Sequence, residues 1–241
     1  MNMNKNITKA QISQEDSKVI SYPNLVGSED LKENSGVTRN PGMDFKLDKI
    51  SNIAINKSAV ERRCSNYGTR RSIKKDKQAA WLLKAITLMD LTTLSGDDTD
   101  ARVRRLCSKA KQPISNKLEK ILGVESLNLS VAAVCVYHDM LASAKDALKP
   151  TEINLAAVST GFPAGLSPLP LRLQEIEYSV DSGANEIDIV ISRRHVLEGN
   201  WEDLYKEVKM FREKCGDAHM KTILATGELG NLSNIAKASQ V

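Results

Sequence analysis

The chain has 241 residues, 41% of them hydrophobic, so it is long enough for one or two domains with a sizeable buried core. Its net charge of +4 is uneven, because residues 1–79 carry 15 Lys and Arg against 9 Asp and Glu, whereas residues 80–241 carry 19 against 21. The larger part therefore lacks the basic excess of a nucleic-acid-binding surface, and no apolar run approaches the ~20 residues that span a bilayer, so neither a nucleic-acid nor a membrane partner is expected.

The N-terminus, MNMNKNITKAQISQED, lacks the apolar stretch of a secretory signal and contains acids that are rare in transit peptides. The scattered cysteines Cys64, Cys107, Cys135 and Cys215 favour reduced thiols and a cytoplasmic protein. Neither the cysteines nor the three histidines have the spacing of metal ligands, so we expect no metal and no other cofactor.

Residues 1–44 are predicted to be a disordered polar arm, because they are too polar to offset the entropy of ordering. The spacing of apolar residues predicts a helical lead-in over residues 45–79, and RRSIKKDKQAAWLLKAI reads as a helix that runs into the first strand. The basic residues of this region are Arg70, Arg71, Lys74, Lys75 and Lys77. They indicate either a nucleic-acid or nuclear-import patch or, the commoner case, a solvated helix face.

From residue 80 onward, a short apolar run, a turn and a longer amphipathic segment repeat. The predicted strands are Ile86–Leu91, Val131–Tyr137, Ile153–Ser159, Glu186–Ile191 and Met220–Ala225. The predicted helices are Thr99–Lys111, Met140–Leu148, Leu171–Asp181 and Asn200–Cys215, and Leu232–Val241 begins as another. This alternation predicts an α/β fold with right-handed βαβ units and a parallel sheet.

A closed (β/α)8 barrel needs eight strands over ~250 residues, whereas residues 80–241 hold five predicted strands. We therefore expect an incomplete barrel with about five of eight units. Its first and fifth strands should present long apolar edges that favour aggregation, a homo-oligomer or pairing with another chain.

Alternation along the fourth strand places Glu186 and Asp188 on one face and Ile187 and Ile189 on the other. Because a buried carboxylate is costly unless it is paired or used, the two acids are either a candidate acid–base site or part of a structural ion pair with a lysine of the barrel. Lys221 is expected to be that inward partner rather than a nucleophile, since it lies near the start of its predicted strand, away from the active-site end.

Asp90 ends the first predicted strand and Thr92 follows it, at the end where barrel enzymes place active-site groups. Taken alone, the pattern Asp-x-Thr-Thr is more often a turn that binds its own backbone. Cys135 lies among small apolar residues and is interpreted as a buried small hydrophobe rather than a nucleophile. The glycine-rich loop 160–165 lacks a phosphate-binding fingerprint and is weak evidence by itself.

Five segments follow one another over residues 45–241: QAAWLLKAITLMDLTTLSGDDT, AAVCVY, GFPAG, GANEIDIVI and KTILATGELG. As a set they resemble the eukaryotic type of deoxyribose-phosphate aldolase. The resemblance implies a class I aldolase on a TIM barrel, which cleaves the small sugar phosphate 2-deoxy-D-ribose 5-phosphate to D-glyceraldehyde 3-phosphate and acetaldehyde through a lysine imine, without a metal, in deoxyribonucleoside catabolism.

The same resemblance assigns roles to individual residues. Asp188 matches the catalytic carboxylate that relays protons with a lysine and a water. Asp90 and Thr92 match substrate-side residues of the first strand, and Cys135 matches a cysteine near the pocket. Lys221 is added to this substrate-side set as the lysine expected to face the carboxylates.

The family's imine-forming lysine lies on a sixth strand in a motif like FIKTSTGK, a second lysine lies on a seventh in one like FKPAGG, and phosphate-binding loops follow. None of these motifs occurs within residues 1–241. The chain is therefore expected to be an aldolase by family but inactive alone. Two alternatives stay open: a non-catalytic barrel fragment that acts as a binding or regulatory module on a full-length aldolase, and a nucleic-acid or import role for the basic arm.

Overall fold

The computed structural model describes residues 42–70 and 72–241. The predicted disordered arm, apart from its last three residues, and Arg71 of the basic run lie outside the described residues. The chain divides into two compact units, Met1–Asp44 and Phe45–Val241, and all described helices and strands belong to the second. Because helix α4 (Lys75–Ile86) crosses residue 80, the division into a lead-in and a barrel remains a prediction.

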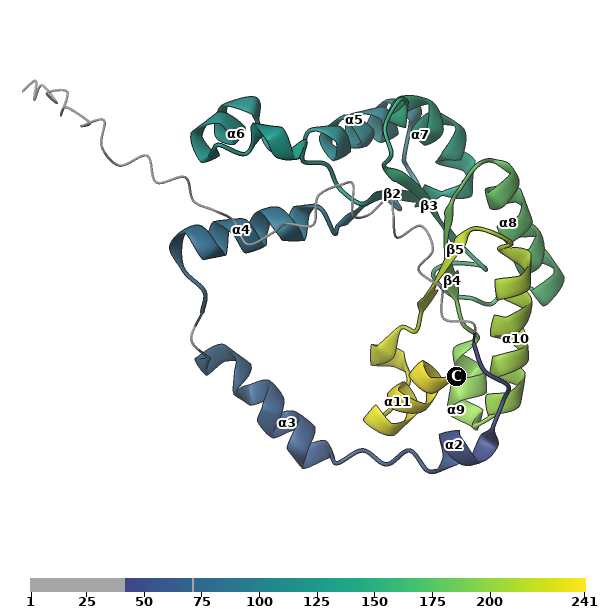
Figure 1. Ribbon diagram of the computed structural model, residues 1–241. Helices are drawn as coiled ribbons and strands as arrows, with labels where there is room; N and C mark the ends of the chain where they lie inside the picture. The colour runs from purple at the N-terminus through teal and green to yellow at the C-terminus, as the bar shows by residue number, and fades with distance from the viewer. Residues whose placement is uncertain (1–41, 71) are drawn as a thin grey trace, which may run out of the picture. The chain divides into compact units, whose positions relative to one another are not determined.

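Five parallel strands form one sheet in chain order (Figure 1). They are β1 (Asp90–Thr92), β2 (Ala133–Tyr137), β3 (Asn154–Ser159), β4 (Glu186–Val190) and β5 (His219–Ile223). The last four match the predicted strands to within two residues. The first predicted strand is present, but its predicted start is wrong, because Ile86 still belongs to helix α4 and the strand begins only at Asp90.

The helices of the second unit follow the predicted alternation with the strands. They are α2 (Leu47–Ser51), α3 (Lys57–Ser65), α4, α5 (Asp100–Lys111), α6 (Asn116–Leu122), α7 (Leu141–Leu148), α8 (Leu169–Asp181), α9 (Arg193–Glu198), α10 (Trp201–Lys214) and α11 (Leu232–Gln240). Helices α6 and α9 were not predicted, because neither is long enough to show a clear apolar period. Each ends at a glycine with left-handed φ, Gly123 and Gly199, which is the common helix-ending signal.

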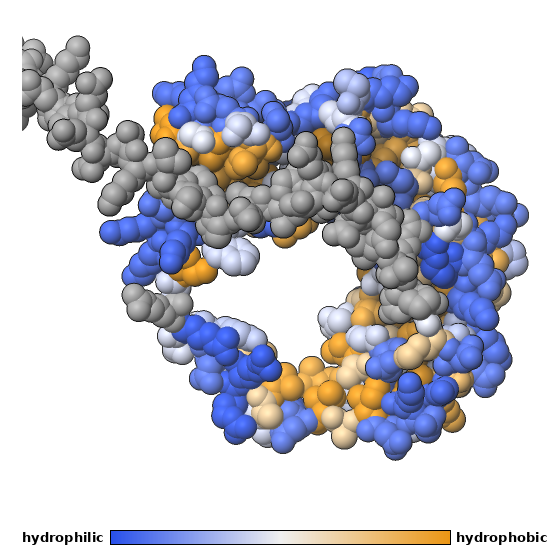
Figure 2. All heavy atoms as spheres, in the orientation of Figure 1, coloured by the Kyte–Doolittle hydropathy of each residue, from blue (hydrophilic) through white to orange (hydrophobic). Residues whose placement is uncertain are grey.

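The two faces of the sheet have different partners. Ile187 and Ile189 are fully buried in the main hydrophobic core, which also contains residues of α7, α8 and α10, helices that lie along one side of the sheet in Figure 1. Each such side chain stabilises the fold by roughly 1.5–3 kcal/mol. The outward surfaces of α8 and α10 are hydrophilic, as Figure 2 shows. The opposite face of the sheet carries a smaller apolar cluster around Ala133, Cys135 and Val158.

The edge strands differ from the prediction. Strand β1 has only three residues, and its two exposed residues, Asp90 and Thr92, are polar. Strand β5 carries His219, Lys221 and Thr222 among its five residues. The expectation of long apolar edges is therefore wrong, since the edges are short and largely polar, which disfavours indiscriminate pairing.

In the part of the chain that the structure describes, no helix is both long enough and apolar enough to cross a bilayer.

Candidate functional site

Lys221 lies between three carboxylates on the face of the sheet opposite Ile187 and Ile189, which is called the inner face below. Its Nζ lies 2.9 Å from Glu186 Oε2 and 3.0 Å from Asp188 Oδ1, and it also forms an ion pair with Asp90 Oδ2. These residues come from β5, β4 and β1, so the first and last strands of the sheet meet across its inner face. The predicted contact of Lys221 with Asp188 or Glu186 is confirmed, and Asp90 joins the same cluster.

The side chains of the cluster are mostly shielded from water. Glu186 and Asp188 expose 13% and 16% of their side chains, and Lys221 exposes 30%. Glu186 Oε1 also accepts a hydrogen bond of 2.7 Å from Asn154 Nδ2. Three acids around one cation leave a formal charge of −2, so the site attracts a further positive charge or a proton.

The electrostatics of Lys221 argue against its acting as a nucleophile. Burial opposes its charge, but hydrogen bonds to Asp90 and Glu186 and the charge of Asp188 outweigh burial, so the pKa of Lys221 is raised above its ordinary 10.5. The amine is therefore protonated at neutral pH and cannot attack a carbonyl. Its predicted position near the start of the strand was wrong, because Lys221 lies in the middle of β5, level with Asp188. The reason against a nucleophilic role is therefore its charge and not its place in the strand.

The carboxyl of Asp188 has a shifted pKa. Burial raises the pKa of this carboxyl, although the charge of Lys221 acts in the opposite direction. Its Oδ2 accepts a hydrogen bond from Cys135 Sγ at 3.7 Å. A raised pKa is the direction of shift that a carboxyl needs to act as a general acid or base.

Cys135 faces the same side of the sheet and is 2% exposed. Burial, followed by the charge of Asp188, raises the pKa of its thiol to about 12. This agrees with the interpretation of Cys135 as a buried small hydrophobe, because only the thiolate is a strong nucleophile.

The state of Cys135 can be tested by alkylation with iodoacetamide at pH 8, followed by mass spectrometry. With a pKa of about 12, only roughly one thiol in ten thousand is ionised at this pH, so Cys135 should stay unmodified in the folded chain. The exposed Cys64 is the internal control and should react first. Labelling of Cys135 at the rate of Cys64 before denaturant is added would contradict the assignment.

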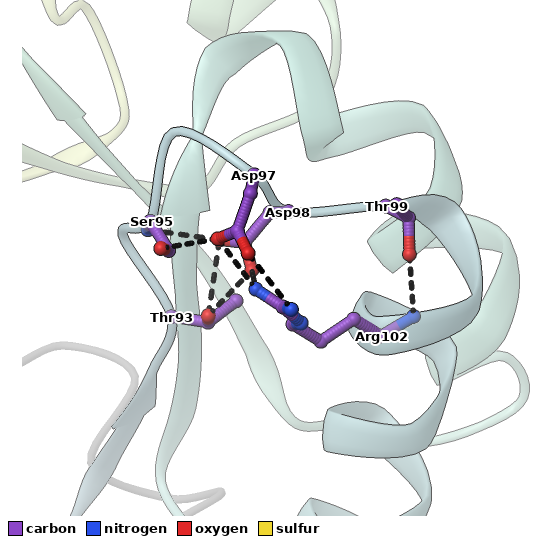
Figure 3. A network of polar contacts seen from close by, with 6 residues as sticks. All are labelled: Thr93, Ser95, Asp97, Asp98, Thr99 and Arg102. Carbon is purple, nitrogen blue, oxygen red and sulfur yellow. Dashed lines mark hydrogen bonds and ion pairs between the residues drawn. The ribbon is translucent and has the colours of Figure 1, made fainter.

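The loop after β1 is fixed by a network that the sequence analysis missed (Figure 3). Asp98 accepts hydrogen bonds from Thr93 Oγ1 at 2.9 Å and from Ser95 N at 3.0 Å. Asp97 forms an ion pair of 2.8 Å with Arg102, and the hydrogen bond from Arg102 lowers the pKa of Asp97. The signal was present in the sequence: two acids before a Thr helix cap, with an arginine three residues after that cap.

This network holds the chain next to Asp90 and Thr92. Thr92 Oγ1 donates a hydrogen bond of 2.9 Å to the carbonyl oxygen of Asp90. Thr92 thus binds its own backbone, as the turn interpretation expected, whereas the Asp90 side chain points to Lys221 instead. Among residues 42–70 and 72–241, no group of three or more His, Cys, Asp or Glu side chains could hold a metal ion.

The comparisons with known proteins agree with this architecture. The sequence model of the DeoC/LacD family aldolases matches residues 84–241, a span that includes all five strands and the whole Lys221 cluster. The chain belongs to this family.

Curated relatives within the family have closely similar sequences. The deoxyribose-phosphate aldolase of Mus musculus is 54% identical over 202 residues, which cover 83% of this chain and 64% of the relative. That of Homo sapiens is 52% identical over 204 residues, or 84% of this chain and 64% of the relative. The chain thus spans about 64% of the length of these relatives. The resemblance drawn from the sequence motifs is confirmed.

Solved structures of DeoC/LacD-type aldolases share the fold. One named for deoxyribose-phosphate aldolase, from Coccidioides immitis, has a TM-score of 0.55 at 22% identity and covers 77% of this chain and 67% of its own. Another, from Toxoplasma gondii, has a TM-score of 0.53 at 19% identity, with 68% and 58% covered. At these identities the likeness shows the fold alone, and it confirms the α/β class and an incomplete (β/α)8 barrel.

The glycine-rich loop of this aldolase-family chain ties β3 to β4. Thr160 Oγ1 donates to the carbonyl oxygen of Val190 at 2.9 Å and accepts from Val190 N at 2.6 Å. Gly165 has a φ of +68°, and a Cβ there would lie 3.2 Å from the carbonyl oxygen of Ile191. The glycine is therefore required by the backbone and by close packing on the strand end.

A buried polar network behind this loop was also missed. Glu207 Oε2 lies 2.8 Å from Arg172 Nη2, and the same carboxylate accepts hydrogen bonds from Ser192 N and Ser192 Oγ at 2.7 and 2.6 Å. The sequence could have indicated that Glu207 faces the core, because it is three residues after Leu204 and four before Phe211, both of which are buried on the same helix. A charge at a core-facing position predicts a buried partner.

Proposed function

We propose that this chain carries the acid–base part of a class I aldolase site for 2-deoxy-D-ribose 5-phosphate, with D-glyceraldehyde 3-phosphate and acetaldehyde as products. The observation that carries the proposal is the Lys221 cluster. In it Asp188, whose pKa is raised, lies 3.0 Å from the ammonium group of Lys221 on the inner face of the sheet. Family membership and the names of the curated relatives support the same reaction class and substrate.

In this proposal Asp188 is the proton donor and acceptor. Its carboxyl is held beside Lys221, whose positive charge stabilises the ionised form after a proton has left. Asp90 and Thr92, the first and last residues of β1, bind the substrate's hydroxyl groups. Cys135 fills the space behind Asp188 and keeps water from its Oδ2.

Cleavage through an imine also needs a neutral amine, which attacks the substrate carbonyl and releases water. Lys221 does not meet this requirement, because its protonated state is stabilised by three carboxylates. We infer that residues 1–241 on their own do not form the imine and are inactive.

Borohydride trapping tests the role of Lys221. The purified chain is incubated with 2-deoxyribose 5-phosphate and sodium borohydride, and adducts are located by peptide mass spectrometry. We expect no adduct and no glyceraldehyde 3-phosphate, whereas the human deoxyribose-phosphate aldolase serves as the positive control. An adduct on Lys221 would show that its amine is the nucleophile.

A chimera tests the role of Asp188. Residues 84–241 are joined to the part of the human relative that this chain does not cover, and retro-aldol activity is measured. We expect the chimera to be active and Asp188→Asn to lower kcat about 10²–10⁴-fold, the usual contribution of a general acid or base. Glu202→Gln, on the exposed side of α10, is the control and should leave kcat unchanged.

A non-catalytic role is the second candidate. The observation that favours it is that β1 and β5 each pair with only one other described strand, which leaves one side of each strand open to a partner chain. In this case the chain would bind a full-length aldolase and alter its activity. Co-elution with the human relative in size-exclusion chromatography would support this role, and separate elution would exclude it for that partner.

A further inference from the structure

Arg193 joins three loops at the carboxyl end of the sheet. It is the first residue of α9 and follows closely on the end of β4. Its Nη1 and Nη2 donate to the carbonyl oxygens of Pro163 and Ala164, in the loop after β3, at 3.2 and 2.9 Å. Its Nε forms an ion pair of 2.9 Å with Glu228 Oε2, in the turn after β5. One guanidinium therefore connects the loops that follow β3, β4 and β5, and these contacts are called the Arg193 clamp below.

The chemistry of the side chain suits this position. A guanidinium is planar and carries its N–H groups in a fixed fork, so it can bind several acceptors in one orientation. The Arg193 side chain is 18% exposed, whereas that of Glu228 is 66% exposed. Because water screens an exposed carboxylate, the two bonds to carbonyl oxygens supply most of the restraint, and the ion pair extends it to the loop after β5.

Phe162 comes directly before the two carbonyl groups that Arg193 binds. On the other side of Phe162, the N–H of Gly161 donates to Glu175 Oε2 at 2.7 Å, so the loop is anchored both before and after the ring. The ring packs against the small apolar cluster on the inner face of the sheet, and its centre lies 6.0 Å from that of Tyr137. The Arg193 clamp thus fixes the backbone that places this ring on the inner face.

The cluster under Phe162 contains Cys135, whose Sγ donates to Asp188 Oδ2 at 3.7 Å. Ile223, the last residue of β5, packs against the same cluster. Both loops that Arg193 holds therefore begin beside apolar side chains that cover the inner face. Cys135 is only 2% exposed beneath this cover.

We propose that Arg193 is a positioning residue, which holds the loops after β3 and β5 over the inner face so that Phe162 and Ile223 exclude water from Cys135 and Asp188. This inference rests on the proposed function for the role of Asp188, but the clamp itself can be tested without any catalysis. Burial is what raises the pKa of the Asp188 carboxyl. Release of the clamp would hydrate this carboxyl and lower its pKa toward the ordinary value of a carboxyl in water.

Cysteine labelling of the full chain is the first test, with iodoacetamide at pH 8 and mass spectrometry as the readout. We expect Arg193→Ala to speed the labelling of Cys135 roughly tenfold or more, the effect of one charge-assisted hydrogen bond on an opening equilibrium. Cys107 and Cys215 are fully buried in the main core and should stay unmodified, and the exposed Cys64 is the reference. Arg193→Lys keeps the charge but not the fork, so it should restore part of the protection.

Arg212→Ala is the matched control. The guanidinium of Arg212 also donates to carbonyl oxygens of a loop, those of Gly216 and Ala218, but this loop precedes β5 at the opposite end of the sheet. We expect it to cause no selective labelling of Cys135. Unchanged labelling of Cys135 in Arg193→Ala, an equal rise at the two core cysteines, or the same selective rise in Arg212→Ala would overturn the proposal.

Kinetics of the active chimera test the link to Asp188. We expect Arg193→Ala to lower kcat and to move the pH dependence of kcat to lower pH, because the hydrated carboxyl has a lower pKa. An active chimera in which neither changes would overturn the positioning role. An inactive parent chimera, together with selective labelling of Cys135 in Arg193→Ala, would instead contradict the proposed function and support the clamp.

Discussion

Glu207→Ala is expected to lower the free energy of unfolding by about 3–5 kcal/mol, the usual effect of removing one partner of a buried ion pair. Glu207 is 4% exposed and holds both Arg172 and Ser192. Its loss leaves a buried guanidinium without a counter-charge and the N–H of Ser192 without an acceptor. Since small domains are stable by only about 5–15 kcal/mol, such a loss would be a large share of the total. Urea denaturation followed by circular dichroism measures it.

The same helix offers a matched control. Glu202 lies 2.8 Å from Lys206, the same separation as between Glu207 and Arg172, but both side chains of the Glu202–Lys206 pair are more than half exposed. Glu202→Ala should cost no more than about 1 kcal/mol, because water screens exposed pairs. Glu207→Gln keeps the shape but removes the charge, and it should fall between the two. Equal losses in Glu202→Ala and Glu207→Ala would show that burial of the pair does not matter.

The elements that sequence reasoning placed well are those with two independent signals. Strands β2 to β5 combine apolar runs with β-branched residues and turn residues at both ends, and all four were found to within two residues. Strand β1 failed because the stretch from Trp81 to Met89 is continuously apolar apart from single polar residues, and periodicity cannot separate a buried helix from a strand there. The three-residue strand follows α4 directly, with Leu88 N bonded back to Ala85.

The candidate site shows a different limit. Alternation along β4 was enough to place Asp188 and Glu186 together and opposite the isoleucines. It could not place Asp90 with them, because Asp90 is 131 positions from Lys221 and reaches it only through the curvature of the sheet. Contacts between strands that are distant in sequence depend on tertiary geometry, which local patterns do not encode.

Lys221→Met should destabilise the fold by about 2–4 kcal/mol at pH 7.5, because three carboxylates would then face one another without a cation. Part of this loss should disappear as the pH falls toward 5. Burial already raises the pKa of Asp188 above its ordinary 3.8, and removal of Lys221 raises it further. A carboxyl whose folded pKa is raised gives stability that is complete below its unfolded pKa and is lost as the pH rises through the folded pKa. The variant should therefore be closest to the unmodified chain in acid and furthest from it above neutrality.

In the unmodified chain, the contribution of Lys221 to stability has a different pH dependence from that of Asp188. Because the folded pKa of Lys221 is raised above 10.5, the stabilisation from its charge is constant throughout pH 5–9. This stabilisation is lost only as the pH rises above 10.5 and through the folded pKa. Urea unfolding at pH 5 and pH 7.5 separates the two effects, with Lys214→Met as a control that breaks the exposed pair with Glu177. If the difference in the free energy of unfolding between Lys221→Met and the unmodified chain stays constant or widens toward pH 5, carboxylate repulsion is not the cause of the destabilisation. A gap that narrows would identify Lys221 as the residue that allows Asp188 to be ionised inside the sheet.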